Sequence, residues 1–177
     1  VVRISSNPNF RADRFWSPQA LYNEGGFALI TSDAKEKDEL LASIGVNVNF
    51  APVCDVSTDP ADFINARAFG RDAAQTSEYV RTVVAQMLSD QIGMVLKHFP
   101  GYGNNLDTHT GIAIDERPIE SFRESDFLPF RAGIDAGAQS VLVSHNIVTC
   151  MDAELPASLS PAVHQVLRDE LGFDGVV

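Results

Sequence analysis

An amphipathic helix, a glycine and a short apolar strand follow one another four times, and this repeat constrains the fold more than any other feature. The predicted helices are residues 34–44, a segment after Asp72, residues 127–136 and a segment after Ser160. The predicted strands start near residues 46, 94, 140 and 174. Strict alternation of helices with mostly apolar strands predicts a parallel sheet covered by helices.

Local signals mark the ends of these helices. Asp33 and Glu36 have the spacing of a capping box, which predicts that the first helix begins there. Ser160 followed by Pro161 is typical of an N-cap and a first helical residue. Glycines are expected to end the four helices, at positions 45, 93, 137 and 172. We therefore expect substantial polar loops after the strands, over residues 55–72, 100–118 and 146–159.

Composition and charge narrow the class of ligand. The chain has 177 residues and a net charge of −11, from 13 basic and 24 acidic side chains. An acidic surface opposes binding to nucleic acid or to an anionic membrane, because both need clustered Lys and Arg. No apolar run approaches the roughly 20 residues that span a bilayer. A neutral or small ligand is the better expectation.

The two cysteines, Cys54 and Cys150, form neither a disulfide framework nor a zinc motif, and we expect buried thiols. No secretion signal is seen, and the chain opens on Val1 without Met. A cytoplasmic location is the expectation, with further residues upstream. Residues 1–177 are expected to form one domain.

Polar side chains collect where the predicted strands end. Asp55 follows the first strand, Lys97 and His98 the second, and His145 and Asn146 the third. Active sites of (β/α)₈ barrels are built at strand C-termini, and doubly wound sheets collect ligand groups there too. The absence of a Gly-rich phosphate loop between a strand and a helix argues against a nucleotide-binding domain.

Three groups of these residues are candidates for chemistry. Lys97 and His98 adjoin a buried strand, so they need partners or a ligand. Asp107 and His109, two apart in a polar loop, suit a proton-transferring pair, although an ordinary solvated turn is the simpler interpretation of spacing alone. A metal site using both together with His98 has no recognised ligand spacing. Arg67 could donate to substrate hydroxyls or pair with a surplus acid.

Five motifs in order resemble the N-terminal barrel of bacterial glycoside hydrolase family 3, in its β-N-acetylglucosaminidase (β-hexosaminidase) branch. The motifs are NFAPVCDV at 49–56, NARAFG at 65–70, KHFPGYG at 97–103, DTH at 107–109 and LGFDGVV at 171–177. The resemblance covers essentially residues 46–177. It implies a partial TIM (β/α)₈ barrel of about four parallel strands alternating with helices, in one incomplete domain, without a cofactor or metal.

The resemblance also implies roles for individual residues. His109 corresponds to the acid/base, with Asp107 as its partner. Arg67, Lys97 and His98 correspond to groups that bind the terminal sugar, and Arg3 to a further sugar-binding Arg, whose Glu-Gly-Gly motif would precede Val1. The implied activity is retaining removal of terminal β-linked N-acetylglucosamine from glycans or peptidoglycan fragments.

Two departures from the family pattern leave the catalytic groups in place: Tyr102 stands where His is common, and Thr108 where Ser is common. The family's nucleophile, an Asp, is expected after Val177, so the 177 residues alone are expected to be inactive. The alternatives are a β-glucosidase of the same family and a non-catalytic sugar-binding barrel fragment. The oligomeric state is not indicated.

Overall fold

The computed structural model describes residues 2–105 and 111–177, with side chains from residue 4 onward. The main helices are α2 (Pro18–Ser43), α3 (Ala73–Ser89), α5 (Phe127–Asp135) and α6 (Pro161–Gln165). Shorter helical segments are α1 (Val2–Ser5), α4 (Ile119–Ser121), η1 (Phe122–Asp126), η2 (Ala157–Leu159) and η3 (Val166–Glu170). The strands are β1 (Val48–Asn49), β2 (Gly93–Met94), β3 (Leu96–Phe99), β4 (Ile114–Asp115), β5 (Val141–Val143) and β6 (Ile147–Val148).

All the strand pairs are parallel among the described residues. β1 pairs with β2, β3 with β5, and β4 with β6. Isolated bridges, Val53 to Lys97 and Ser140 to Val176, continue the same pattern on either side of β3 and β5. The chain therefore has an α/β fold in which short parallel strands alternate with helices. β4 and β6 lie in segments that the sequence analysis treated as loops.

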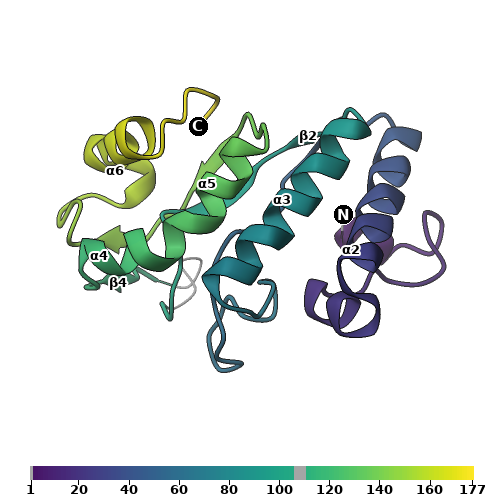
Figure 1. Ribbon diagram of the computed structural model, residues 1–177, viewed down its shortest axis with the longest axis horizontal. Coiled ribbons are helices and arrows are strands. Elements are labelled where there is room, and N and C mark those ends of the chain that lie inside the picture. Colours follow the sequence, from purple (N-terminus) through teal and green to yellow (C-terminus); the bar gives the residue numbers. More distant parts are fainter. Residues whose placement is uncertain (1, 106–110) are drawn as a thin grey trace.

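The helices pack side by side over the strands. Figure 1 shows α2, α3 and α5 next to one another, and α3 contacts both of its neighbours. Phe99 of β3 lies beneath α5, with its ring centroid 5.6 Å from Phe127 and 5.3 Å from Phe130. Gly133 of α5 meets Leu96 so closely that an added Cβ would lie 2.7 Å from it. This aromatic core fixes β3, the strand that carries Lys97 and His98.

Capping explains two helix starts and corrects a third. The side chains of Asp72 and Ser160 accept hydrogen bonds from Gln75 N and Val163 N. The sequence predicted the cap at Ser160 and a helix after Asp72. The start predicted at Asp33 is wrong, since α2 begins after Ser17 and runs through Asp33. Non-helical backbone at Gly25 and Gly26 interrupts α2, and this break hides its first half from a search for helical periodicity.

The predicted end of the second helix at Gly93 is also wrong. α3 ends at Ser89, Gln91 adopts φ 58°, and Gly93 is already part of β2. By contrast Gly45, Gly137 and Gly172 follow their helices with positive φ, as expected of residues that stop a helix.

An apolar hollow lies beside β1 and β5. It has a volume of about 430 Å³ and is lined mainly by Val48, Phe50, Val95, Leu142 and Val176. Phe50 and Val176 are 57% and 70% exposed. One side of the strand layer thus presents apolar side chains that the described residues do not cover. No helix of the described ranges is long and apolar enough to cross a membrane.

Candidate active site

The site is built where β1, β3 and β5 end. Beyond β1 the chain continues to Val53, which bridges to Lys97, and Cys54 N donates to Lys97 O at 2.6 Å. This pairing sets Asp55 beside Lys97 and His98. Ser144 N, after β5, donates to Phe99 O at 2.7 Å. Three strand ends are thereby joined into one floor.

Asp55 is the buried centre of this floor, with 1% of its surface exposed. One carboxylate oxygen accepts from His98 Nδ1 at 2.8 Å and from His98 N at 3.2 Å. The other accepts from Tyr102 N at 2.8 Å. The sequence analysis placed Asp55 at a strand end but gave it no role. Its donors come from a segment more than forty residues away, which no local pattern reveals.

Arg67 reaches the same place from the loop after β1. Its Nη2 lies 3.4 Å from His98 Nε2. Two hydrogen bonds stabilise this loop. Asn65 Nδ2 donates to Ser57 O at 3.1 Å, and Gln19 Nε2 donates to Asn65 O at 2.7 Å. Arg67 itself is exposed, and within residues 4–105 and 111–177 its remaining N–H groups make no hydrogen bond, so they can face a ligand.

Lys97 is half-buried beside Arg67 and Asp55. Burial lowers the pKa of Lys97 and the nearby Arg67 charge lowers it further, while Asp55 opposes both. Within residues 4–105 and 111–177, its Nζ makes no ion pair with a carboxylate. The structure thus brings Arg67, Lys97 and His98 together. They form a donor-rich surface suited to the hydroxyls of a neutral polar ligand.

The other predicted site residues are not placed. Asp107 and His109 lie outside the described residues. Arg3 belongs to α1, and its side chain lies outside the described part of the structure. His145, at the end of β5, is exposed, and its Nδ1 lies 2.7 Å from Ser158 Oγ. No group of three or more His, Cys, Asp or Glu in the described ranges could hold a metal ion.

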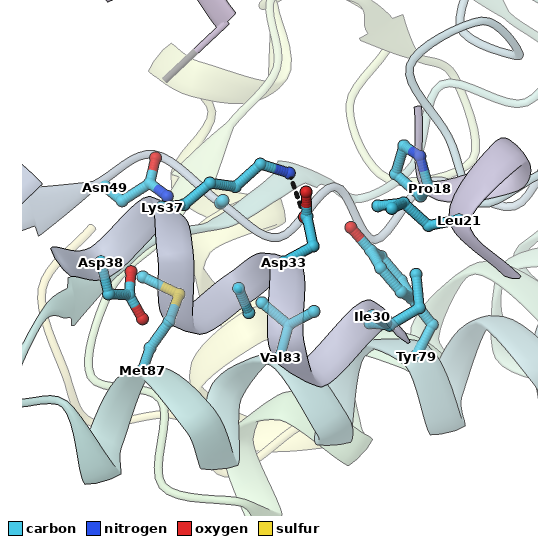
Figure 2. A pocket seen from close by; sticks show the side chains of 12 residues that line it. Pro18, Leu21, Ile30, Asp33, Lys37, Asp38, Asn49, Tyr79, Val83 and Met87 are labelled. Atoms are coloured by element: carbon cyan, nitrogen blue, oxygen red, sulfur yellow. Dashed lines mark hydrogen bonds and ion pairs between the residues drawn. The ribbon is translucent and has the colours of Figure 1, made fainter. Parts of the chain in front are cut away.

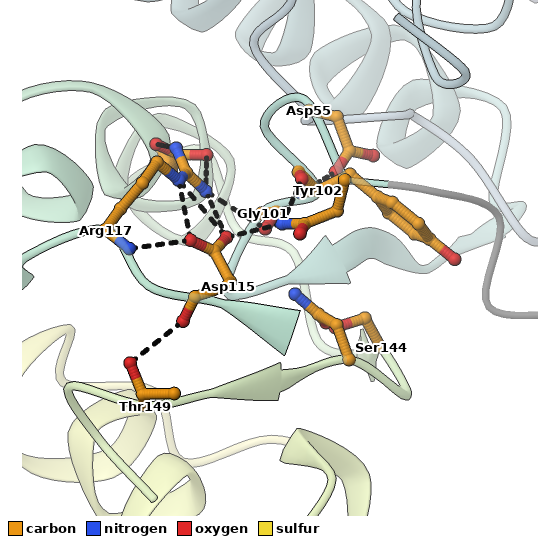
Figure 3. A network of polar contacts seen from close by, with 10 residues as sticks. Asp55, Gly101, Tyr102, Asp115, Arg117, Ser144 and Thr149 are labelled. Atoms are coloured by element: carbon orange, nitrogen blue, oxygen red, sulfur yellow. Dashed lines mark hydrogen bonds and ion pairs between the residues drawn. The ribbon is translucent and has the colours of Figure 1, made fainter. Parts of the chain in front are cut away.

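A second polar network holds the two ends of the segment between β3 and β4 (Figure 3). Arg117 donates to both oxygens of Asp115 and, through Nη1, to Asp126 Oδ2 at 2.9 Å. Asn105 Nδ2 donates to Tyr102 O at 2.8 Å and to Asp115 Oδ2 at 2.6 Å. Residues 102–105 are therefore tied to residues 115–117.

Charge and burial compete in this network. Burial disfavours the Arg117 cation, but its hydrogen bonds to Asp115 and Asp126 outweigh this effect and raise the pKa of Arg117. Burial raises the pKa of Asp126 to about 6, against the attraction of Arg117. The sequence analysis missed all three residues. The one local signal was the spacing of Asp115 and Arg117, which lie two residues apart at the end of β4.

Comparisons with known proteins show the family of the chain. Residues 9–177 match the N terminal domain of glycosyl hydrolase family 3. A β-hexosaminidase of Xanthomonas campestris is 37% identical over 155 residues, 87% of this chain and 46% of that protein. One of Stenotrophomonas maltophilia is 42% identical over 135 residues, 75% of this chain and 40% of that protein. The chain spans about half the length of these relatives.

Solved structures are similar over nearly the whole chain. A family 3 glycosyl hydrolase of Mycobacterium smegmatis superimposes with a TM-score of 0.86 at 32% identity, over 98% of this chain and 54% of that one. A family 3 β-N-acetylglucosaminidase of a Paenibacillus strain has a TM-score of 0.84 at 29% identity, over 90% of this chain and 31% of that one.

Proposed function

Because this chain belongs to glycosyl hydrolase family 3, we propose that the whole protein is a β-N-acetylhexosaminidase that removes terminal β-linked N-acetylglucosamine with retention of configuration. One observation carries the proposal. Arg67, Lys97 and His98 converge around the buried Asp55 at the strand ends. Relatives named β-hexosaminidase support the choice of substrate over a glucoside.

We further propose that the fold is part of a (β/α)₈ barrel. Four parallel segments, at residues 48–53, 93–99, 141–143 and 176, alternate with helices that pack on one side of them. In such barrels the strands' inner side is apolar and the active site lies at their C-terminal ends. The uncovered apolar hollow beside β1 and β5 is consistent with that inner side.

The proposed mechanism separates binding from proton transfer. Arg67 and Lys97 donate to the hydroxyls of the terminal sugar, and His98 lies beside Arg67 with its ring nitrogens facing Asp55 and Arg67. His109, oriented by Asp107, protonates the leaving oxygen and later activates water. An Asp of the whole protein acts as the nucleophile and attacks the anomeric carbon, which gives a glycosyl-enzyme intermediate. A His acid/base is reasonable, since an imidazole titrates near neutral pH.

Substrate assays of the full-length protein test the proposal. We expect turnover of 4-nitrophenyl β-N-acetylglucosaminide to exceed that of the β-glucoside. Lys97→Ala should remove a charged hydrogen bond, worth about 1.5–3 kcal/mol in transition-state binding, and lower kcat/KM about 10- to 100-fold. The control is Lys35→Ala, which removes an exposed cation paired with Glu39. Preference for the glucoside would make the protein a β-glucosidase, and no turnover of either sugar would favour a non-catalytic barrel.

The role of His109 needs its own experiment. A nitrophenolate leaves without protonation, whereas a sugar hydroxyl does not. His109→Ala should therefore slow glycosylation by a disaccharide far more than by the nitrophenyl glycoside. Azide, which needs no general base, should then restore turnover of the nitrophenyl glycoside and yield a glycosyl azide. Equal slowing of both substrates, with no effect of azide, would transfer the acid/base role to another residue.

A further inference from the structure

The hydrogen bonds around His98 determine which of its ring nitrogens carries hydrogen. Nδ1 lies 2.8 Å from Asp55 Oδ2. That same oxygen already accepts from His98 N, and the other oxygen accepts from Tyr102 N. A carboxylate surrounded by donors is an acceptor, so Nδ1 must be the N–H that faces it.

The opposite nitrogen faces a group that can only donate. Arg67 Nη2 lies 3.4 Å from His98 Nε2, and a guanidinium has no acceptor atom. Nε2 must therefore present its lone pair. The two neighbours of the ring, one acceptor and one donor, select the same neutral tautomer. The ring is also held edge-on against Tyr102, with centroids 5.2 Å apart.

We propose that Asp55 is a positioning residue that fixes His98 as the Nδ1–H tautomer, so that Nε2 accepts from Arg67 and holds its guanidinium toward the sugar. This role rests on the proposed glycosidase function, because it assigns Arg67 and His98 to sugar binding. Asp55 is 1% exposed, and its two carboxylate oxygens face His98 and Tyr102, so it acts through His98 rather than on the substrate.

The Asp55→Asn variant tests the contacts from Asp55 through His98 to Arg67, because an amide has nearly the same shape as a carboxylate. An amide has one acceptor oxygen, and it cannot accept from Tyr102 N and from His98 at once. With its NH₂ toward His98 Nδ1, the amide favours the Nε2–H tautomer, which sets N–H against the Arg67 guanidinium. We expect kcat/KM to fall about 10- to 100-fold, the usual cost of losing a residue that orients an active-site His. Asp59→Asn is the matched control, because its Oδ1 accepts only from Ala61 N among the described residues, and an amide oxygen replaces it.

A double-mutant cycle separates positioning from general stability. If Asp55 acts through His98, then Asp55→Asn should lower kcat/KM far less in a His98→Gln background than in the wild type. A purely structural role predicts the same fold-loss in both backgrounds. That additive result would overturn the proposal.

The tautomer can be measured without any variant, in the full-length protein labelled with ¹⁵N-histidine and assigned through His98→Gln. We expect the His98 signals of a neutral ring with hydrogen on Nδ1, and loss of that pattern in Asp55→Asn. Hydrogen on Nε2 in the wild type would overturn the proposal even if Asp55→Asn fails to fold. The expected tautomer in a protein that hydrolyses no hexosaminide would instead refute the proposed function alone.

Discussion

Buried carboxylates near the strand ends have hydrogen-bond donors around them, whereas a buried carboxylate in the helix layer does not. Asp55 and Asp115, 1% and 2% exposed, accept several hydrogen bonds each, and Arg117 also pairs with Asp126, which lies at the end of η1. Asp38 in α2 is 1% exposed, yet neither of its oxygens accepts a hydrogen bond from a described residue. A buried charge without a donor is costly, and this cost favours the protonated form of Asp38.

The surroundings of Asp38 explain the contrast (Figure 2). It lines a pocket of about 50 Å³ between α2 and α3, beside Met87 and Val83. The neighbouring Lys37 points the other way and pairs with Asp33 at 2.5 Å. Burial and the carboxylate of Asp90 raise the pKa of Asp38 to about 7. Asp38 and Asp90 can share a hydrogen bond only while one of them holds a proton. Carboxylates near the strand ends therefore act as hydrogen-bond acceptors, whereas the surroundings of Asp38 in the helix layer favour the protonated acid.

The largest expected effect comes from removing the cation at the strand ends. Arg117→Ala leaves Asp115 and Asp126 buried without their common partner, and breaking a buried pair in this way costs about 3–5 kcal/mol. Urea unfolding of the full-length protein at pH 7 measures this loss. Arg123→Ala, which removes an exposed pair with Glu170, should change the free energy of unfolding little. If both variants lost the same free energy of unfolding, burial of the carboxylates would not determine the cost of removing their Arg partner.

In the helix layer, replacing Asp38 by Asn should increase the free energy of unfolding, the opposite of the effect of Arg117→Ala. The pKa of Asp38 is higher in the folded protein than the usual 3.8, so the folded state binds the proton more tightly. Its contribution to stability is complete below about pH 4 and is lost as the pH rises to about 7. Asp38→Asn should therefore stabilise the full-length protein at pH 8, by up to about 4 kcal/mol, and change little at pH 4.

Unfolding of wild type and Asp38→Asn at the two pH values provides the measurement. Destabilisation by Asp38→Asn at pH 8 would mean that the ionised carboxylate has a stabilising partner. The contrast between the two regions would then fail. Asp33→Asn serves as a comparison, since it removes a carboxylate of the same pocket that is paired with Lys37.

The same contrast explains what the sequence could predict. Lys97 and His98 were singled out because they lie in a contiguous motif at a strand end, and Arg67 because it lies in a contiguous motif in the loop after β1. Helix starts at Asp72 and Ser160 were found because an N-cap needs only its next three residues. These signals are local, and the structure agrees with them.

Partners distant in the chain could not be predicted. Nothing near Asp55 indicates that Tyr102 and His98 donate to it, and nothing near Asp38 indicates that it lacks a donor. Asp33 illustrates the error in the other direction, since its spacing to Glu36 imitates a cap while its side chain pairs with Lys37 inside α2. Roles that depend on tertiary contacts, including that of Arg117, needed the fold.

The smallest expected effect compares two glycines with positive φ, one in each region. Gly103 (φ 54°) lies against Arg117, and an added Cβ would be 2.6 Å from its guanidinium carbon. Gly45 (φ 77°), after α2, has nothing within 4 Å of the same position. Both alanine variants incur the backbone strain of a left-handed conformation, about 1 kcal/mol. Only Gly103→Ala also displaces Arg117 from Asp115 and Asp126. It should therefore cost about 1 kcal/mol more and lower kcat/KM, whereas Gly45→Ala should leave kcat/KM unchanged.

Thermal unfolding and the nitrophenyl assay on the full-length protein measure both quantities. Equal stability losses with intact activity in both variants would show that the Arg117 network accommodates a methyl group, and that the ends of the segment between β3 and β4 need not be held so tightly.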